Sequence, residues 1–407
     1  MAFLKNGYIL PVSTSEFDKY KVDHLFLLIG ENPLPNYVAA KLLLNDGGTP
    51  YLVHTADTVE QAKRLQNILK SESNSSKDVE LRSLNDYESD AYHIQTEIRE
   101  KLESIKSGKI GLNYTGGTKA MSTHAYRTLF YEEIKDKTYK DKTYKKREGI
   151  TFSYLDARKL EMCIDREDNE RIRLKIKPDI LPVKLVKIFQ LHGLELDPKP
   201  IQQAQLPNLA IELANVFQEE AKQKQWFDWY QNIFCQEARK KKQNGSWGEW
   251  KSETSLKEVS TCLEKLPKEI VAAFNQESFV TSDSQLSLQE VQKTEIFKKL
   301  KHFCEWLDGL WLEHYVLEQV NHIVHSHLVT DYGLNFEIPL KDTEDGFQFD
   351  IAFTRGYQLF AISCTTSNDR KLCKSKLFEA YIRAKQMGGD EARVALFSVH
   401  PAVLWEQ

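Results

Sequence analysis

Several features of other protein classes are missing from this sequence of 407 residues. No run approaches the about 18 apolar residues of a membrane-spanning helix, and the opening MAFLKNGYILPV lacks the sustained apolar stretch of a secretory signal. The six cysteines show no CxxC spacing, which favours reduced thiols over disulfides or a zinc site. We therefore expect a cytoplasmic protein with no membrane partner.

The sequence also lacks an excess of positive charge, since its formal net charge is -4 at pH 7. This argues against a surface coated with basic side chains for nucleic acid, so a polyanion would have to bind at a local patch. Hydrophobic residues make up 41% and charged residues 28%, which indicates a folded globular protein rather than a disordered one. The length favours two or three domains.

The most informative stretch is LNYTGGTKAM, residues 112–121. A short apolar strand pattern precedes its two glycines and a helix is predicted over residues 121–133, so the glycines lie in the connection. Adjacent glycines let the backbone approach a ligand, and the amides and dipole of a helix start attract an anion. Thr118 and Lys119 add a hydroxyl and a cation. From these residues alone, an anion site and an ordinary tight turn are equally supported.

The chain before this turn alternates between strand and helix patterns. Strands are predicted over residues 24–30, 50–54 and 79–84, and helices over 38–44, 57–69 and 89–107. This alternation predicts an α/β, Rossmann-like domain with a mostly parallel, doubly wound sheet. Ligands of such sheets bind beyond the carboxyl ends of the strands, where residues 30–32 and the glycine turn would share one pocket.

Three further strand patterns, over residues 150–155, 159–164 and 171–176, predict an antiparallel end to this sheet, and we place its boundary near Lys177. Before them, the repeated KDKTY of residues 135–146 is interpreted as a solvated excursion, with a basic contact surface as the alternative.

The middle of the chain, residues 178–303, is predicted to be a mainly helical connector. Its helical patterns include residues 207–241 and 256–274, and residues 276–292 are predicted to be a loop. Four tryptophans could stack nucleic-acid bases, but a packed helical core or a dimer contact is the preferred interpretation; they are Trp226, Trp229, Trp247 and Trp250. A basic patch over residues 239–242 is explained equally well as a solvated helix end.

The last part, residues 304–407, is predicted to be a compact α/β unit. It contains a helix over residues 306–324 that carries Glu313 and a strand over residues 347–353 that carries Asp350. Further patterns predict strands over 334–339, 358–364 and 394–398 and a helix over 370–387. Cys364 is interpreted as a buried thiol rather than a nucleophile. Four histidines lack a partner constellation for a metal; they are His314, His322, His325 and His327.

With GENPLPNY and NYTGGTKAM at the ends of alternating strands, the first part resembles a CARF domain, the CRISPR-associated Rossmann fold that binds cyclic oligoadenylates. The resemblance implies a homodimer in which the ligand ring lies across the two-fold axis. It also implies a set of ligand-binding residues, namely Asn32, Gly116, Gly117, Thr118, Lys119 and Met121.

With WLEHYV on a helix and FQFD on a strand, the last part resembles a PD-(D/E)xK, restriction-endonuclease-like domain. The order of the parts is similar to that of type III CRISPR effectors. The resemblance implies a nuclease that uses a divalent metal, Mn²⁺ or Mg²⁺, cuts DNA, RNA or both, and is activated by a cyclic oligoadenylate, with cyclic tetra-adenylate favoured. Glu313 and Asp350 would be catalytic and would hold the metal.

The resemblance also implies an acidic residue and a lysine, two apart, where this chain has Ser363 and Thr365. One explanation is that a functional lysine or acid comes from the following helix, which carries Lys371, Lys374, Lys376 and Glu379. Lys374, beside the apolar stripe predicted from Cys373, Leu377, Ala380, Tyr381 and Ala384, is then the first candidate, and Lys371 is the second.

The other explanation is a pseudo-nuclease that binds nucleic acid or a protein without cutting. A third possibility, that the CARF domain also degrades its ligand, stays open.

Overall fold

The computed structural model describes residues 4–5, 8–9, 16–72, 78–134, 143–165, 170, 172–196, 199–338 and 347–399. The chain forms two compact units. Unit 1 contains Met1–Glu195 and two short segments from much later in the chain, Thr354–Leu359 and Arg383–Arg393; unit 2 contains the rest. Among the described residues, no helix is both long and apolar enough to cross a membrane.

Unit 1 is built on a seven-stranded sheet in the order β11-β10-β9-β6-β3-β4-β5. The strands are β3 (Val22–Leu28), β4 (Leu44–His54), β5 (Glu80–Ser83), β6 (Ile110–Asn113), β9 (Ile150–Asp156), β10 (Glu161–Asp165) and β11 (Ile172–Lys175). Neighbours from β9 to β5 are parallel, and β10 and β11 complete the sheet in antiparallel fashion. The predicted α/β, Rossmann-like sheet is therefore confirmed.

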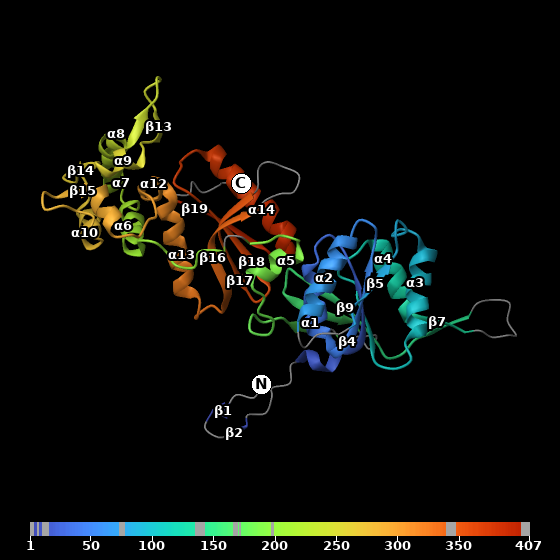
Figure 1. The fold of residues 1–407 in the computed structure, drawn as a ribbon. Helices are drawn as coiled ribbons and strands as arrows, with labels where there is room; N and C mark the ends of the chain where they lie inside the picture. Colours follow the sequence, from blue (N-terminus) through green and yellow to red (C-terminus); the bar gives the residue numbers. More distant parts are fainter. Residues whose placement is uncertain are drawn as a thin grey trace. The chain divides into compact units, whose positions relative to one another are not determined.

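Helices cover both faces of this sheet, with α1 (Leu34–Leu43) and α2 (Val59–Ser71) on one side and α3 (Ala91–Ser104) and α4 (Lys119–Phe130) on the other (Figure 1). The chain order reverses at β3, because β4 and β5 extend the sheet in one direction and β6 and β9 in the other. Beyond this reversal point, the loops that follow β3 and β6 lie side by side, since the two strands are parallel neighbours.

The end of the predicted helix over residues 121–133 is wrong. Helix α4 stops at Phe130, and β7 (Tyr131–Ile134) pairs in antiparallel fashion with β8 (Thr143–Lys146). Pairing with a later segment outweighs the weak helix propensity of these residues. The pairing of β7 with β8 agrees with the predicted solvated excursion at this place in the chain. Residues 135–142 of the repeat lie outside the described residues.

Unit 2 contains α6 (Pro207–Val216), α7 (Glu220–Trp229), α8 (Cys235–Ala238), α9 (Glu253–Lys257), α10 (Lys268–Gln276), α11 (Leu288–Lys293) and α12 (Leu300–Glu305). Trp226 and Trp229 are 2% and 0% exposed and pack in one core with Phe234 and Phe274, which confirms a packed helical core for these two. Their large apolar surfaces stabilise the fold and are closed to bases. Trp247 and Trp250 are partly buried and pack against the same core.

Two antiparallel strand pairs interrupt the helices of unit 2 where the sequence predicts otherwise: a hairpin before α9, and a second pair whose strands lie on either side of α10 in the sequence. The helix predicted to continue to residue 241 ends at Ala238 and is followed by β12 (Arg239–Lys241) and β13 (Trp247–Trp250). The loop predicted over residues 276–292 contains β15 (Gln285–Ser287), which pairs with β14 (Ser260–Cys262). Both pairings join strands that are separated in sequence, and periodicity does not report such contacts.

The last part of the chain forms a four-stranded sheet in the order β16-β17-β18-β19, as the strand patterns predict. The strands are β16 (Val329–Ile338), β17 (Phe347–Arg355), β18 (Gln358–Thr365) and β19 (Arg393–Ser398). Helix α13 (Trp311–Ile323) precedes the sheet, directly after a π-helical turn at Trp306–Leu310, and α14 (Arg370–Gly388) connects β18 to β19.

The apolar stripe predicted for α14 is wrong in part. Leu377 and Tyr381 are 40% and 49% exposed, whereas Ala380 and Ala384 are buried. Within the predicted stripe, the small alanines are therefore buried and the large apolar side chains point outward, while Met387 is buried near the end of the helix.

Candidate functional site

The two glycines of the turn after β6 are required by close packing. A Cβ on Gly116 would lie 2.2 Å from the carbonyl oxygen of Leu28, the last residue of β3. Gly117 has a φ of +74°, which side chains other than glycine rarely adopt, and a Cβ there would lie 3.0 Å from the Leu28 Cβ. The glycines are thus explained by the fold alone, and a ligand is not needed to account for them.

The next three residues begin helix α4. The Thr118 hydroxyl accepts a hydrogen bond from the Met121 amide at 3.1 Å and donates one to the Glu88 carbonyl at 3.1 Å. Met121 is 0% exposed and lies in the core beneath Gly117. Lys119, by contrast, is exposed. The amides of Lys119 and Ala120 have no acceptor within the helix, so the cation and these amides are what an anion would meet.

The loop after β3 lies against this turn. A Cβ on Gly30 would be 3.2 Å from the Gly117 amide nitrogen. The structure therefore brings together the two loops that the sequence assigned to one pocket.

The side chain of Asn32, in the loop after β3, contacts the start of α1 and the backbone near Gly389. Its Oδ1 accepts a hydrogen bond from the Leu34 amide at 2.9 Å. Its Nδ2 is buried, has no partner among the described residues, and lies 3.1 Å from where a Cβ of Gly389 would stand.

A buried carboxyl group lies beside Gly389. Glu391 is 0% exposed, and neither of its carboxyl oxygens has a hydrogen-bond partner within the described ranges. Burial raises the pKa of Glu391 to about 7. The neighbouring Tyr357 hydroxyl is buried and equally unpartnered among the described residues.

A second site forms around Asp350, on β17 in unit 2. Asp350 is 6% exposed, and its Oδ2 accepts hydrogen bonds from the Ser363 hydroxyl at 3.0 Å and the Cys364 amide at 2.6 Å, both on the neighbouring strand β18. Its Oδ1 receives no hydrogen bond from any described residue. Asp350 is therefore held in place through one oxygen, and the other is left for a ligand.

Glu313, on α13, is the second carboxylate of this site. Burial and, next, the negative charge of Asp350 raise the pKa of Glu313, while Lys376 opposes the shift. No described residue donates a hydrogen bond to the Glu313 carboxylate. The predicted pair Glu313 and Asp350 is thus brought into electrostatic contact by the fold.

The lysine that the structure places here is Lys376. Its Nζ lies 4.0 Å from the Asp350 Oδ2 and donates a hydrogen bond of 2.9 Å to the Cys364 carbonyl oxygen. Lys371 and Lys374 occupy exposed positions of the same helix. Lys376 shares the inward face with Ala380 and Ala384, which lie four and eight residues later. Those small residues were the signal for this face in the sequence.

The donor set suits a hard divalent cation. Carboxylate oxygens are the ligands that Mg²⁺ and Mn²⁺ prefer, and a cation would relieve the repulsion between two carboxylates in a partly buried place. Glu313 and Asp350 would hold it. Within the described ranges, no group of three or more His, Cys, Asp or Glu side chains is arranged around a metal position.

The remaining candidates near this site have structural roles. The His314 Nδ1 accepts a hydrogen bond from the Gln205 amide at 3.1 Å, and burial lowers the pKa of His314 to about 4, so its ring is neutral. Cys364 is 3% exposed, and burial raises the pKa of its thiol. The interpretation of Cys364 as a buried thiol is confirmed.

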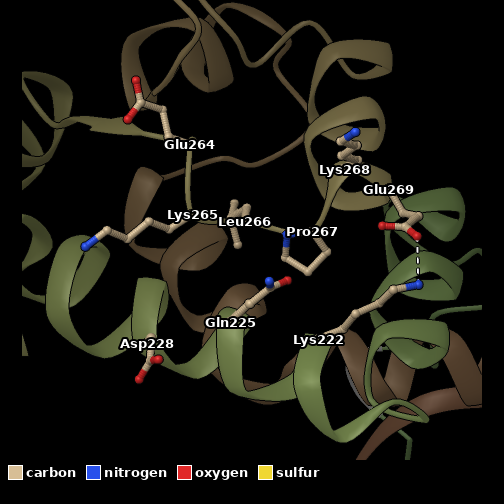
Figure 2. A pocket seen from close by; sticks show the side chains of 9 residues that line it. All are labelled: Lys222, Gln225, Asp228, Glu264, Lys265, Leu266, Pro267, Lys268 and Glu269. Atoms are coloured by element: carbon tan, nitrogen blue, oxygen red, sulfur yellow. Dashed lines mark hydrogen bonds and ion pairs between the residues drawn. The ribbon is translucent and has the colours of Figure 1, made fainter.

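A cavity of about 620 Å³ lies between α7, α10 and the loop before α10 (Figure 2). Three lysines and three carboxylates line it, and Lys222 pairs with Glu269 at 2.8 Å; the others are Lys265, Lys268, Asp228 and Glu264. Because the charges balance, this cavity offers no preference for an anion.

Comparison with known proteins identifies a domain family for most of the sheet of unit 1. Residues 25–164 match the family model of the Card1 CARF domain. A search among curated proteins found no match.

Three solved structures share the fold. Protein VC1899 from Vibrio cholerae is 16% identical, with a TM-score of 0.63 over 93% of this chain and 89% of that one. Can2 from Sulfobacillus thermosulfidooxidans, solved with cyclic tetra-adenylate, is 15% identical, with a TM-score of 0.60 over 94% and 91%. A type III CRISPR defence DNA nuclease activated by cyclic oligoadenylate is 14% identical, with a TM-score of 0.50 over 92% of this chain and 44% of that one. Residues 25–164 thus match the CARF domain of the Card1 kind, and 93% and 94% of the chain share the fold of VC1899 and Can2.

Proposed function

We propose that this protein is a cyclic-oligoadenylate-activated, metal-dependent nuclease of type III CRISPR defence. The observation that carries the sensing part is the CARF match over residues 25–164, which spans both loops at the reversal point of the sheet. Can2, of the same fold, was solved with cyclic tetra-adenylate, and this supports the same activator here. In this proposal Lys119 and the first amides of α4 bind phosphate groups of the ring.

The catalytic part of the proposal rests on Asp350, Glu313 and Lys376. A bound Mn²⁺ or Mg²⁺ would activate water and offset charge on the scissile phosphate. Glu313 and Asp350 hold that cation, and the two donors from β18 keep Asp350 in one orientation. Lys376 places its ammonium group beside the carboxylates, where it stabilises charge on the phosphate or transfers a proton.

Lys376 thereby takes the role that the sequence analysis proposed for Lys374 or Lys371. In this proposal the lysine comes from α14, while Ser363 fills the strand position by holding Asp350.

The proposed active state is a homodimer. A cyclic tetra-adenylate has internal symmetry that matches a two-fold axis between two copies of the first site. The outward face of α14 offers apolar surface that a second copy could cover, since Leu377, Phe378 and Tyr381 are 40%, 65% and 49% exposed. Sedimentation with and without the activator measures this directly.

The second candidate is a sensor whose C-terminal part binds nucleic acid or a protein without cutting. The observation in its favour is that Ser363 and Thr365 stand where the nuclease pattern has an acid and a lysine, and no third carboxylate joins Glu313 and Asp350 within the described residues.

The test is incubation of plasmid DNA and of single-stranded RNA with the protein and Mn²⁺ or Mg²⁺, with and without cyclic tetra-adenylate. The proposal expects cutting that needs both the metal and the activator. Binding of cyclic tetra-adenylate without cutting under any of these conditions would favour the second candidate. Analysis of the nucleotide after incubation shows whether the protein also degrades its activator.

A further inference from the structure

The hairpin β12–β13 carries three lysines in succession, Lys240, Lys241 and Lys242. Its tip is closed by hydrogen bonds from the Lys242 amide to the Ser246 carbonyl at 2.9 Å and from the Gly245 amide to the Lys242 carbonyl at 3.0 Å. Residues 240–246 are exposed, and the hairpin projects from the helical part of unit 2 (Figure 1).

These lysines are poorly compensated by nearby carboxylates. Lys240 lies 3.8 Å from Glu249, which is itself 89% exposed, so this pair contributes little. Within the described part of the chain, no carboxylate lies within ion-pair distance of Lys241 or Lys242. Adjacent uncompensated cations repel each other, and an anionic partner that spans several residues would remove this repulsion.

The base of the hairpin is fixed through Arg239. Its guanidinium carbon lies 3.7 Å from the centre of the Trp250 ring, and its Nη1 donates a hydrogen bond of 3.1 Å to the Gly248 carbonyl. Arg239 also forms an ion pair with Asp308, whose other oxygen accepts a hydrogen bond from the Tyr230 hydroxyl. The hairpin is thus anchored by stacking and by charge, and its lysines extend from a rigid base.

Asp308 connects this anchor to the carboxylate site. It lies in the π-helical turn Trp306–Leu310, which continues directly into α13, the helix of Glu313. A Cβ on Gly309 in this turn would lie 3.1 Å from the Thr366 hydroxyl, just after β18. The hairpin base and the carboxylate site are therefore joined by the short segment from Asp308 to Glu313, which bends at Gly309, where the backbone has a non-helical φ of 171°.

We propose that the β12–β13 hairpin binds the phosphate backbone of the nucleic acid that reaches the Asp350 site, through Lys240, Lys241 and Lys242. The choice of nucleic acid as partner rests on the proposed nuclease function. Lysines of this kind contact phosphates without reading sequence, so the hairpin positions the strand, and DNA and RNA both carry the chemistry it recognises.

The experiment measures nucleic-acid binding without cutting. Fluorescent single-stranded DNA, duplex DNA and single-stranded RNA are titrated with the full chain in EDTA, with and without cyclic tetra-adenylate, between about 50 and 200 mM salt. The double variant Lys241→Ala/Lys242→Ala should raise Kd by about 10-fold and lower the slope of log Kd against log salt by about 1.5. Replacement of both lysines by arginine should restore both values.

The matched control is Lys265→Ala/Lys268→Ala, which removes two lysines of the charge-balanced cavity in Figure 2. It should leave both Kd and the salt slope at the wild-type values. A hairpin variant with wild-type Kd and slope, or equal losses in both double variants, would overturn the proposal. Thermal unfolding of each variant shows that the exposed substitutions leave the fold intact.

The outcomes separate this inference from the proposed function. If the hairpin variant loses binding while the wild-type protein never cuts with any metal, the hairpin proposal stands and the nuclease proposal fails. If the wild-type protein cuts and the hairpin variant binds and cuts equally well, the reverse holds.

Discussion

The two candidate sites are built from different parts of the polypeptide. The site in unit 1 is made of backbone: two glycines packed on Leu28, the first amides of α4 and one exposed side chain, Lys119. The site in unit 2 is made of side chains from separate elements, namely Glu313 from α13, Asp350 from β17 and Lys376 from α14. The first type of site can be recognised from a few consecutive residues in the sequence. The residues of the second type are far apart in the sequence and come together only when the chain folds.

This difference teaches which substitutions are informative at each site. In unit 1, most positions of the motif serve the fold, so changes there alter stability before they alter binding. In unit 2, the candidate residues are side chains from separate elements, so each can be replaced individually without a change to the backbone that carries it.

The largest effect is expected from loss of a carboxylate in unit 2. Asp350→Ala and Glu313→Ala should each reduce activated cutting by more than about 100-fold, because a ligand of the metal is lost. Affinity for cyclic tetra-adenylate, measured by calorimetry, should stay at the wild-type value. Glu318→Ala, on the same helix, is the control and should keep full cutting. If the double variant Glu313→Ala/Asp350→Ala still cuts, Glu313 and Asp350 are not the catalytic carboxylates.

The next effect distinguishes the lysines of α14. Lys376→Met should reduce the turnover rate by about 100-fold through loss of charge stabilisation or proton transfer. Lys374→Met and Lys371→Met should differ little from the wild-type protein, since both positions are exposed. Single-turnover cutting at saturating substrate measures the chemical step. A larger loss of turnover rate in Lys374→Met than in Lys376→Met would assign the catalytic role to Lys374, the first candidate from the sequence.

The glycine turn separates stability from binding. Gly116→Ala should lower the free energy of unfolding by about 2 to 4 kcal/mol, because its Cβ would collide with the Leu28 carbonyl. Lys119→Ala should change that free energy by less than about 0.5 kcal/mol. It should also weaken the affinity for cyclic tetra-adenylate by about 10- to 100-fold. Denaturant unfolding and calorimetry measure the two quantities. Unchanged ligand affinity in Lys119→Ala would contradict the phosphate-binding role.

The smallest effect concerns Glu391, a buried carboxyl group without donors, in contrast to Asp350. Its pKa is raised from 4.5 to about 7, so the folded state holds the proton more tightly than the unfolded chain. Stability from this group is therefore complete below about pH 4.5 and is lost as the pH rises through 7. Glu391→Gln should be more stable than the wild-type protein by about 2 kcal/mol at pH 8. Equal stabilities of the two proteins at pH 8 would show that Glu391 has a partner in solution.

Much of unit 1 could be predicted from the sequence because its signals are local. Apolar runs such as residues 24–30 give buried parallel strands, and the glycine turn marks the end of β6. The end of α4 and the β12–β13 hairpin could not be predicted, since both depend on pairing with later segments.

Lys376 was missed for a related reason. The large side chains of Leu377 and Tyr381 suggested the buried face of α14, but small alanines pack there and the large residues point outward. A periodic pattern reports the apolar residues of a helix without reporting how close the neighbouring strand lies, and the spacing to that strand selects small residues.

The composition of unit 1 has a consequence for its modularity. Segments 354–359 and 383–393 belong to it, and they supply the Gly356 carbonyl that accepts a hydrogen bond from the Val183 amide at 2.9 Å and the Gly389 backbone beside Asn32. A fragment that ends at Glu195 would lack both. The two units are therefore interleaved along the chain rather than joined end to end, and a truncation or domain exchange must retain these two short segments to keep unit 1 intact.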